Sequence, residues 1–191
     1  MVRKIARYIL TKMKFVFPCK EYEKKAIEFI QEFYDHQSKI NGTGGLDDHL
    51  RNSSYINWLE KVLRDLDIAN IPDGRVPAYT YFYVRDCDNK IIGMINIRLA
   101  LNEFLRNEGG HIGYCIRPLE RKKGYGKRML KEALIFCKTI GMCDIIITFD
   151  KANIASSSII KSCGGILVNE FFSDVFMTDV QKYTISLKIN V

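Results

Sequence analysis

Hydrophobic and polar positions follow a helical period in the first third of the chain. Apolar residues recur every three or four positions within roughly 20–35. A second such stripe begins after Ser53 or Ser54, either of which would serve as its N-cap. The segment 40–48 between the two stripes is a glycine-rich loop, and residues 15–18 are typical of a short strand. We therefore expect this third to be mainly helical.

From residue 78 the pattern becomes typical of strands. Residues 78–85 and 90–101 alternate on either side of a short turn, which predicts an antiparallel hairpin. The run 144–149 is almost continuously apolar, which is typical of a strand buried on both faces. The order predicts one α/β domain with a mixed sheet, completed by helices at 124–140 and 153–163 and by strands at 111–117, 166–171 and 182–189.

Composition narrows the class of protein. The 191 residues are 47% hydrophobic, which is too apolar for a disordered chain. No apolar run approaches the ~20 residues of a membrane span, so we expect no membrane partner. The six cysteines form no C-x-x-C pair and stand apart from the histidines, so we expect no metal site. Isolated cysteines such as Cys115 and Cys137 are typical of buried thiols in a reducing compartment, which predicts a cytoplasmic protein.

The net charge of +7 is concentrated in two places. Residues 1–12 carry +4 and are predicted to be a basic tail, disordered or not native, ahead of a single domain at 13–191. Residues 117–128 carry +5, which leaves the remainder slightly acidic. Because nucleic-acid binding needs a basic face with a reading element beside it, we expect no nucleic-acid partner.

The segment 117–128 lies between a predicted strand and the start of a helix. Gly124 and Gly126 allow the backbone to approach a ligand, and the free amides of a helix start favour a phosphate. With Met129 in place of a third glycine, the segment matches neither standard nucleotide-binding fingerprint. The residues alone leave two readings open: an anion-binding loop, or a glycine turn with a solvated basic helix start.

A family resemblance favours the anion-binding loop. Arg121-Lys-Lys-Gly-Tyr-Gly matches the R/Q-x-x-G-x-G/A pyrophosphate loop of the GNAT superfamily of acetyl-CoA-dependent N-acetyltransferases. The order of elements over roughly 78–191 is also similar. Gly-Gly-His-Ile-Gly-Tyr together with Asn153-Ile-Ala-Ser-Ser resembles an uncharacterised bacterial branch of predicted acetyltransferases.

The resemblance implies a single GNAT-like α+β domain and acetyl-CoA as cosubstrate. The strands at 111–117 and 144–149 would form a central parallel pair that splays into a V. Pantetheine would lie along the backbone of one strand, and the pyrophosphate would rest on the amides of the loop. The implied cofactor-binding residues are Cys115, Ile116, Arg117, Arg121, Lys122, Lys123, Gly124, Tyr125, Gly126, Lys127, Asn153 and Ser156, although Asn153 is equally suited to be a helix N-cap.

The same resemblance suggests catalytic roles. His111 would be the general base, because it opens the central strand where some family members carry a catalytic Glu and its imidazole titrates in a useful range. A structural histidine bonded to the backbone is the alternative. Three carboxylates are further candidates for the base: Glu103, Glu108 and Asp150.

The other two roles fall on the same strand. The amide of Ile116 or of a neighbour would stabilise the oxyanion. Ile160 stands where many family members have the tyrosine acid, so Tyr114, Tyr125 or water would protonate the thiolate, and we favour water or Tyr114. Cys115 is better explained as a buried thiol than as an acetylated intermediate.

The acceptor pocket is the least defined part of the expected site. Asn96 and Arg98 share one face of their strand and are predicted to bind substrate. Arg98 would hold a substrate carboxylate or, as we slightly prefer, pair with an internal acid. Asp47 and Asp48 end the glycine-rich loop, where they would attract a cationic amine or simply stabilise a helix start.

We therefore predict an acyltransferase that moves acetyl from acetyl-CoA to an amine of a small molecule or peptide, by direct attack in a ternary complex. The alternative is a non-catalytic acyl-CoA-binding or sensor module on the same fold, which the missing tyrosine at 160 supports. The oligomeric state stays open, with a homodimer as the commonest default.

Overall fold

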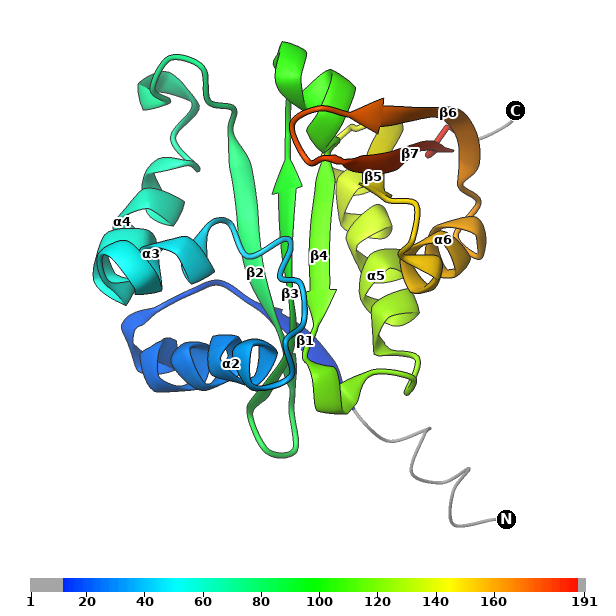
Figure 1. The fold of residues 1–191 in the computed structure, drawn as a ribbon. Helices are drawn as coiled ribbons and strands as arrows, with labels where there is room; N and C mark the ends of the chain where they lie inside the picture. Colours follow the sequence, from blue (N-terminus) through cyan, green and yellow to red (C-terminus); the bar gives the residue numbers. More distant parts are fainter. Residues whose placement is uncertain (1–11, 189–191) are drawn as a thin grey trace, which may run out of the picture.

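The computed structural model describes residues 12–188 of the chain (Figure 1). Its N-terminal part is one strand followed by helices: β1 (Met13–Val16), α2 (Glu23–Asp35), α3 (Leu46–Asn52) and α4 (Tyr55–Arg64). Ser54 caps α4 by accepting a hydrogen bond from the Asn57 amide, as the sequence predicts. Of the predicted tail 1–12, only Lys12 lies within the described residues.

The remainder of the chain alternates strands and helices. A hairpin of β2 (Ala78–Arg85) and β3 (Lys90–Arg98) leads into a π-helical turn, η3 (Leu105–Gly109). The succeeding elements are β4 (Ile112–Ile116), α5 (Tyr125–Thr139), β5 (Asp144–Asp150), α6 (Ile154–Lys161), β6 (Ile166–Ser173) and β7 (Thr178–Ser186). These bounds confirm the predicted hairpin, both predicted helices and the final strands to within a few residues.

The strands form two sheets rather than one. The first has the order β1-β2-β3-β4 and the second β5-β7-β6, and every ladder among the described residues is antiparallel. β4 and β5 share no ladder and meet through a single isolated bridge between Gly110 and Ile147. The expected parallel pairing of these strands is therefore not formed, and the two sheets separate beyond that bridge.

Helices cover both faces of the first sheet (Figure 1). On one face, Phe82 and Met94 pack with α2 and α4 around the fully buried Trp58. On the other face, Ile95 and Ile97 pack with α5 and with the second sheet. Because side chains alternate along a strand, Asn96 and Arg98 share the α2/α4 face with Met94.

Three features depart from the sequence-based expectation. The helix α3 replaces the end of the predicted loop at 40–48, and η3 was not predicted. β5 is not buried on both faces: Ile145 and Ile147 are buried, whereas Asp144 is exposed. Ile146 and Thr148, on the other face of the strand from these two isoleucines, are only partly buried. No helix in the described part of the chain is long and apolar enough to cross a membrane.

Candidate active site

The loop before α5 has the geometry that an anion site needs. Lys122 and Gly124 both have positive φ, at 60° and 82°, which turns the chain sharply into the helix. No side chain caps α5, and its first turn contains no acid. The amides of that turn are therefore available to a ligand, and the helix dipole adds a partial positive charge there.

The basic side chains of this loop are less available than the sequence suggests. Arg117 is buried, pairs with Glu32 at 2.9 Å and donates to the Ile91 carbonyl. Lys123 pairs with the buried Glu120 at 2.8 Å, and Arg128 pairs with its helix neighbour Glu132.

Arg121 is held by neutral groups. It donates to the Ser38 hydroxyl and to the Ile116 carbonyl, and its guanidinium stacks over Phe33. Lys122 and Lys127 are exposed. The sequence placed Arg117 among the cofactor residues, and the structure instead directs its side chain into the protein.

The backbone of β4 has one side free of β3. The amide of Arg117 donates to Ile92, and the amide of Arg98 donates to the carbonyl of His111. Because the register is antiparallel, these bonds show that the backbone N–H and C=O groups of the odd-numbered residues of β4 point toward β3. Cys115 is one of these residues. The backbone groups of Ile112, Tyr114 and Ile116 therefore point away from β3, to the side where the two sheets separate.

Tyr114 is half-buried beside α6, with its hydroxyl fully buried. Burial raises the pKa of its hydroxyl to about 12, and the adjacent Ser156 side chain opposes part of that rise. The hydroxyl is buried without a hydrogen-bond partner within bonding distance among the described residues. A phenol in this environment stays protonated at neutral pH and can donate a proton or hydrogen bond. Tyr125, the other candidate acid, is half-buried against the α5 core.

His111 joins the two sheets at the start of β4. Its amide donates to the Ile146 carbonyl at 2.7 Å, and its Nδ1 accepts from the Ile146 amide at 2.9 Å. With Nδ1 as acceptor, the neutral ring carries its hydrogen on Nε2. Burial lowers the pKa of His111, and the nearby charges of Arg106 and Arg98 lower it further. To accept a proton at Nδ1, the ring would have to break its bond to Ile146.

The further base candidates differ in availability. Asp150 pairs with Lys39 at 2.7 Å, and this hydrogen bond holds the pKa of its carboxyl below the ordinary value. Glu108 has one carboxylate oxygen, Oε2, that is buried without a hydrogen-bond partner in the described structure. Glu103 lies exposed at the start of the turn that leads to η3.

The start of α6 lies beside β4, because the Ser156 side chain is adjacent to the Tyr114 hydroxyl. Asn153 caps this helix, because its side-chain oxygen accepts from the Ser156 amide at 3.1 Å. The capping role proposed as the simple alternative for Asn153 is therefore confirmed. Cys115 is buried, and burial raises the pKa of its thiol to about 12, which fits a structural thiol. All six cysteines are free, and the described residues contain no cluster of potential metal ligands.

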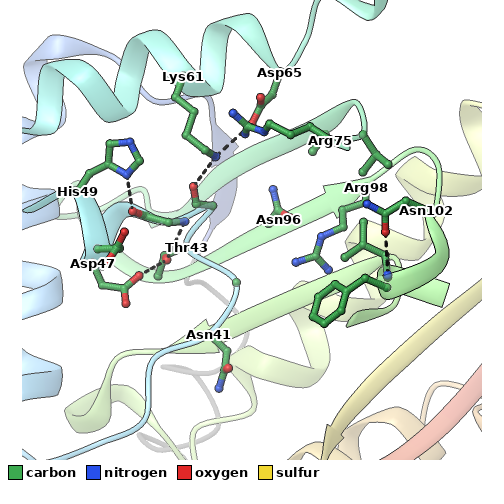
Figure 2. Close-up of a pocket in the computed structure, with 18 of the residues that line it drawn as sticks. Asn41, Thr43, Asp47, His49, Lys61, Asp65, Arg75, Asn96, Arg98 and Asn102 are labelled. Atoms are coloured by element: carbon green, nitrogen blue, oxygen red, sulfur yellow. Dashed lines mark hydrogen bonds and ion pairs between the residues drawn. The ribbon is translucent and has the colours of Figure 1, made fainter. Parts of the chain in front are cut away.

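A pocket of about 570 Å³ lies on the α2/α4 face of the first sheet, in front of β3 (Figure 2). The glycine-rich loop forms one wall, since Gly42 and Gly44 both have positive φ and pack closely. A Cβ on Gly42 would lie 2.2 Å from the backbone of Gly113 and Tyr114. The pocket wall therefore touches the same strand whose outer backbone faces the opening between the sheets.

Both predicted substrate residues line this pocket. Asn96 is fixed by a hydrogen bond to the Thr80 hydroxyl at 3.0 Å. Arg98 donates through Nη1 to the carbonyls of Gly109 and Gly110. The described residues provide no carboxylate partner for Arg98, so the internal ion pair that the sequence favoured is not formed. Burial lowers the pKa of this guanidinium from its ordinary value.

Sequence reasoning missed the remaining polar lining of the pocket. Lys61 and Arg75 both contact the buried Asp65, at 3.2 and 2.7 Å. Lys61 also donates to the Gly44 carbonyl and so fixes the glycine-rich loop. Only the i, i+4 spacing of Lys61 on α4 and Asp65, the residue that ends this helix, could have signalled this cluster, because Arg75 comes from a separate loop.

The layers, the separated strands and the uncapped helix define an acetyltransferase fold. Residues 30–166, well over half of the chain, match the family model "Acetyltransferase (GNAT) domain". The protein belongs to the GNAT acetyltransferase family.

Solved structures agree with this fold. One is the microcin C7 self-immunity acetyltransferase MccE in complex with acetyl-CoA and AMP, with a TM-score of 0.68, 14% identity and coverage of 92% of this chain and 93% of that chain. Another is the ribosomal-protein-S5-alanine acetyltransferase from Vibrio fischeri, at TM-score 0.62, 15% identity and 91% coverage of both chains. A third is the acetyltransferase (GNAT family) from Bacillus anthracis, at TM-score 0.63, 15% identity and coverage of 92% and 96%.

At these identities the structural neighbours show the fold alone. A comparison with the curated proteins found no match. The family assignment and the fold confirm the predicted class, a single GNAT-like α+β domain, and agree with acetyl-CoA as the predicted cosubstrate.

Proposed function

We propose that the protein transfers an acetyl group from acetyl-CoA to an amine, by direct attack in a ternary complex. The observation that carries this proposal is the uncapped start of α5, whose free amides lie beside the opening between β4 and β5. The family supplies the reaction class. The pocket in front of β3 supplies a separate space for the acceptor.

In this proposal the pyrophosphate of coenzyme A is bound by the amides of residues 122–127, with Lys122 and Lys127 adding positive charge. Pantetheine follows the outer backbone groups of β4. The contribution of Cys115 and Arg117 is limited to shaping the strand, because their own amides face β3. Asn153 and Ser156 border the cosubstrate from α6.

The proposed chemistry needs three roles. The acceptor nitrogen attacks the thioester carbonyl, a base takes a proton from that nitrogen, and the C–S bond breaks as the amide forms. The outward amide of Ile116 stabilises the oxyanion. Tyr114 donates its proton to the leaving thiolate, since its buried hydroxyl is protonated and without a bonding partner in the described part of the chain. His111 remains the proposed base, on the condition that its bond to Ile146 opens.

The alternative is a non-catalytic acyl-CoA sensor. Ile160 is fully buried, so the position at which many family members carry a tyrosine acid contributes only packing here. If Tyr114 does not replace that acid, binding without turnover is the expected behaviour.

Two measurements test the proposal in sequence. Calorimetric titration with acetyl-CoA should show binding at concentrations on the order of 100 µM, within the usual KM range. Absence of binding would contradict both the enzyme and the sensor. Release of free thiol is then followed over a panel of amines, and binding without thiol release for any amine favours the sensor.

Two finer proposals concern the setting of the protein. Six free cysteines, of which Cys87 and Cys143 are exposed, favour a reducing compartment such as the cytoplasm. The exposed apolar surface of β6 favours a homodimer.

A further inference from the structure

The charged residues that line the acceptor pocket differ in how far the protein itself neutralises them. Among its charged lining residues, Lys61 and Arg75 are both neutralised by Asp65. Asp47 accepts from the Thr43 hydroxyl and lies in the first turn of α3, where the helix dipole stabilises it. Asp48 contacts Asn52 and Arg51. These acids are therefore partly compensated within the protein.

Arg98 is the exception. Arg98 is half-buried, and the protein contacts of its guanidinium in the described structure are two backbone carbonyls, both reached through Nη1. A guanidinium has five N–H donors, so the donors on Nε and Nη2 are left for a ligand. Figure 2 shows the Arg98 guanidinium pointing into the pocket in front of Asn96. A partly desolvated cation without a counter-ion attracts an anion more strongly than a cation in bulk water does, so a bound oxyanion would be favoured there.

The two amide side chains near Arg98 are held in place by hydrogen bonds within the protein. Asn102 donates to the Gly74 carbonyl and accepts from the Leu105 amide, and Asn96 donates to Thr80. These contacts fix the two amide side chains and keep the wall beside Arg98 rigid. The geometry therefore offers one preorganised fork of donors, which matches the two oxygens of a planar or tetrahedral oxyanion.

We infer, resting on the proposed acetyltransferase function, that the acceptor is an amine that also carries an oxyanion, and that Arg98 binds this oxyanion. The shared chemistry is a carboxylate or phosphate group on a small molecule or on a chain end. A purely cationic polyamine would place positive charge against Arg98, so it should be a poor acceptor.

The first test measures anion binding without turnover. The thermal midpoint of the protein is recorded at constant ionic strength in chloride, succinate and inorganic phosphate. Wild type is compared with Arg98→Gln, with Arg98→Lys, which keeps the charge but loses the fork, and with Arg106→Gln, a charge-matched control on exposed η3. Circular dichroism verifies that each variant is folded. Any stabilisation by anions that bind at the loop before α5 is the same in every variant, so it cancels when the variants are compared.

We expect succinate or phosphate to stabilise wild type and Arg106→Gln more than Arg98→Gln, with Arg98→Lys in between. The anion that gives the larger difference distinguishes carboxylate from phosphate. Equal responses of wild type and Arg98→Gln to both anions would overturn the inference, whatever the protein does with acetyl-CoA.

The second test uses matched amine pairs in the thiol-release assay: L-leucine against 3-methylbutylamine, and O-phosphoethanolamine against ethanolamine. For at least one pair, kcat/KM should favour the acid-bearing member by about 10- to 100-fold, the range of a charge-assisted hydrogen bond. Arg98→Gln should abolish that preference. Equal use of both members by wild type would refute the inference while leaving the acetyltransferase function intact. Failure to bind acetyl-CoA would refute the function, and the anion measurement would still decide the role of Arg98.

Discussion

His111 carries two proposed roles that compete for the same ring nitrogen, one structural and one catalytic. Its ring joins the start of β4 to β5, because Nδ1 accepts a 2.9 Å hydrogen bond from the Ile146 amide. An imidazole that acted as the base would have to leave that bond. The structural and catalytic roles therefore make opposite predictions for one kind of substitution. Its side chain would still accept the hydrogen bond from the Ile146 amide but could not take up a proton at neutral pH.

Asparagine is such a side chain, because its amide oxygen can accept from Ile146 but does not take a proton. His111→Ala should cost stability of about 1 kcal/mol, the usual contribution of a lost hydrogen bond. If His111 is the base, His111→Asn should lose turnover at neutral pH as fully as His111→Ala, with acetyl-CoA affinity unchanged. If the role is structural, His111→Asn should recover both stability and turnover. Steady-state kinetics and urea unfolding of the three proteins decide between them.

The same histidine predicts a pH dependence of stability. The pKa of His111 is lowered in the folded protein, so the unfolded chain binds more protons near and below the ordinary value of 6.5. The contribution of the neutral His111 ring to the free energy of unfolding is present above pH 6.5 and is lost as the pH falls through the folded-state pKa. Urea unfolding between pH 8 and pH 5 should therefore show a steeper loss for wild type than for His111→Asn. Parallel curves would contradict the buried neutral state of the ring.

Tyr114 allows a sharper test of the proposed acid. Removing its hydroxyl in Tyr114→Phe should lower kcat about 100-fold, a typical contribution of general acid catalysis. Acetyl-CoA affinity should not change. Because the hydroxyl is buried without a bonding partner in the described structure, the variant should be at least as stable as wild type. An unchanged kcat would leave water or Tyr125 as the proton donor, and the kcat of Tyr125→Phe distinguishes these two.

Single residues also show where sequence reasoning ends. The loop before α5 and its glycines were predictable, because the motif is recognised from residues that are close together in the sequence. The partners of Arg98 and Arg117 were not, because each contact joins segments that are distant along the chain. Glu32 of α2 neutralises Arg117, and backbone carbonyls rather than an acid contact Arg98. A basic residue in a sequence carries no sign of which acid reaches it.

At the scale of elements, the uncapped start of α5 is the feature on which the proposed cosubstrate binding depends. Gly124 has a φ of 82° there, and Gly141 has a φ of 86° at the other end of the same helix. Replacing either by Ala should cost about 1 kcal/mol of stability, because an L side chain is strained in this region. Only Gly124→Ala should weaken acetyl-CoA binding in calorimetry, since only its strain displaces the amides of the first turn. Equal affinities for the two variants would remove this turn from the cosubstrate site.

The elements themselves were predictable where periodicity extends over several turns or alternations. β2 was predicted to its observed bounds, and α5 to within one residue at each end. α3 was missed because its seven residues bury only Leu46, which leaves no apolar stripe to detect. η3 was missed for the same reason, since it buries none of its own residues. The incomplete burial of β5 follows from the separation of the sheets, which no local pattern records.

For the whole molecule, the second sheet leaves one surface to explain. β6 is its edge strand, and apolar side chains remain exposed along β6 and the turn to β7: Ile166, Val168, Phe172, Val175, Phe176 and Met177. Monomeric proteins rarely expose so many large apolar groups together. Two-fold association of identical chains is the commonest way to cover such a surface. The break in register near Val168 disfavours continuous strand pairing, so side chains would form the contact.

This dimer would lie close to the acceptor pocket, because Phe176 of the turn packs against the pocket residue Phe104 at a ring distance of 6.4 Å. We predict that wild type sediments as a dimer at micromolar concentration and that Phe172→Lys sediments as a monomer. Ile135→Lys, on the exposed face of α5, should remain dimeric and controls for the added charge. Since the turn contacts the pocket wall, Phe172→Lys should also raise KM for the acceptor while leaving acetyl-CoA affinity unchanged. A wild-type monomer at all concentrations would contradict the dimer, whereas a dimeric Phe172→Lys would place the interface elsewhere on the molecule.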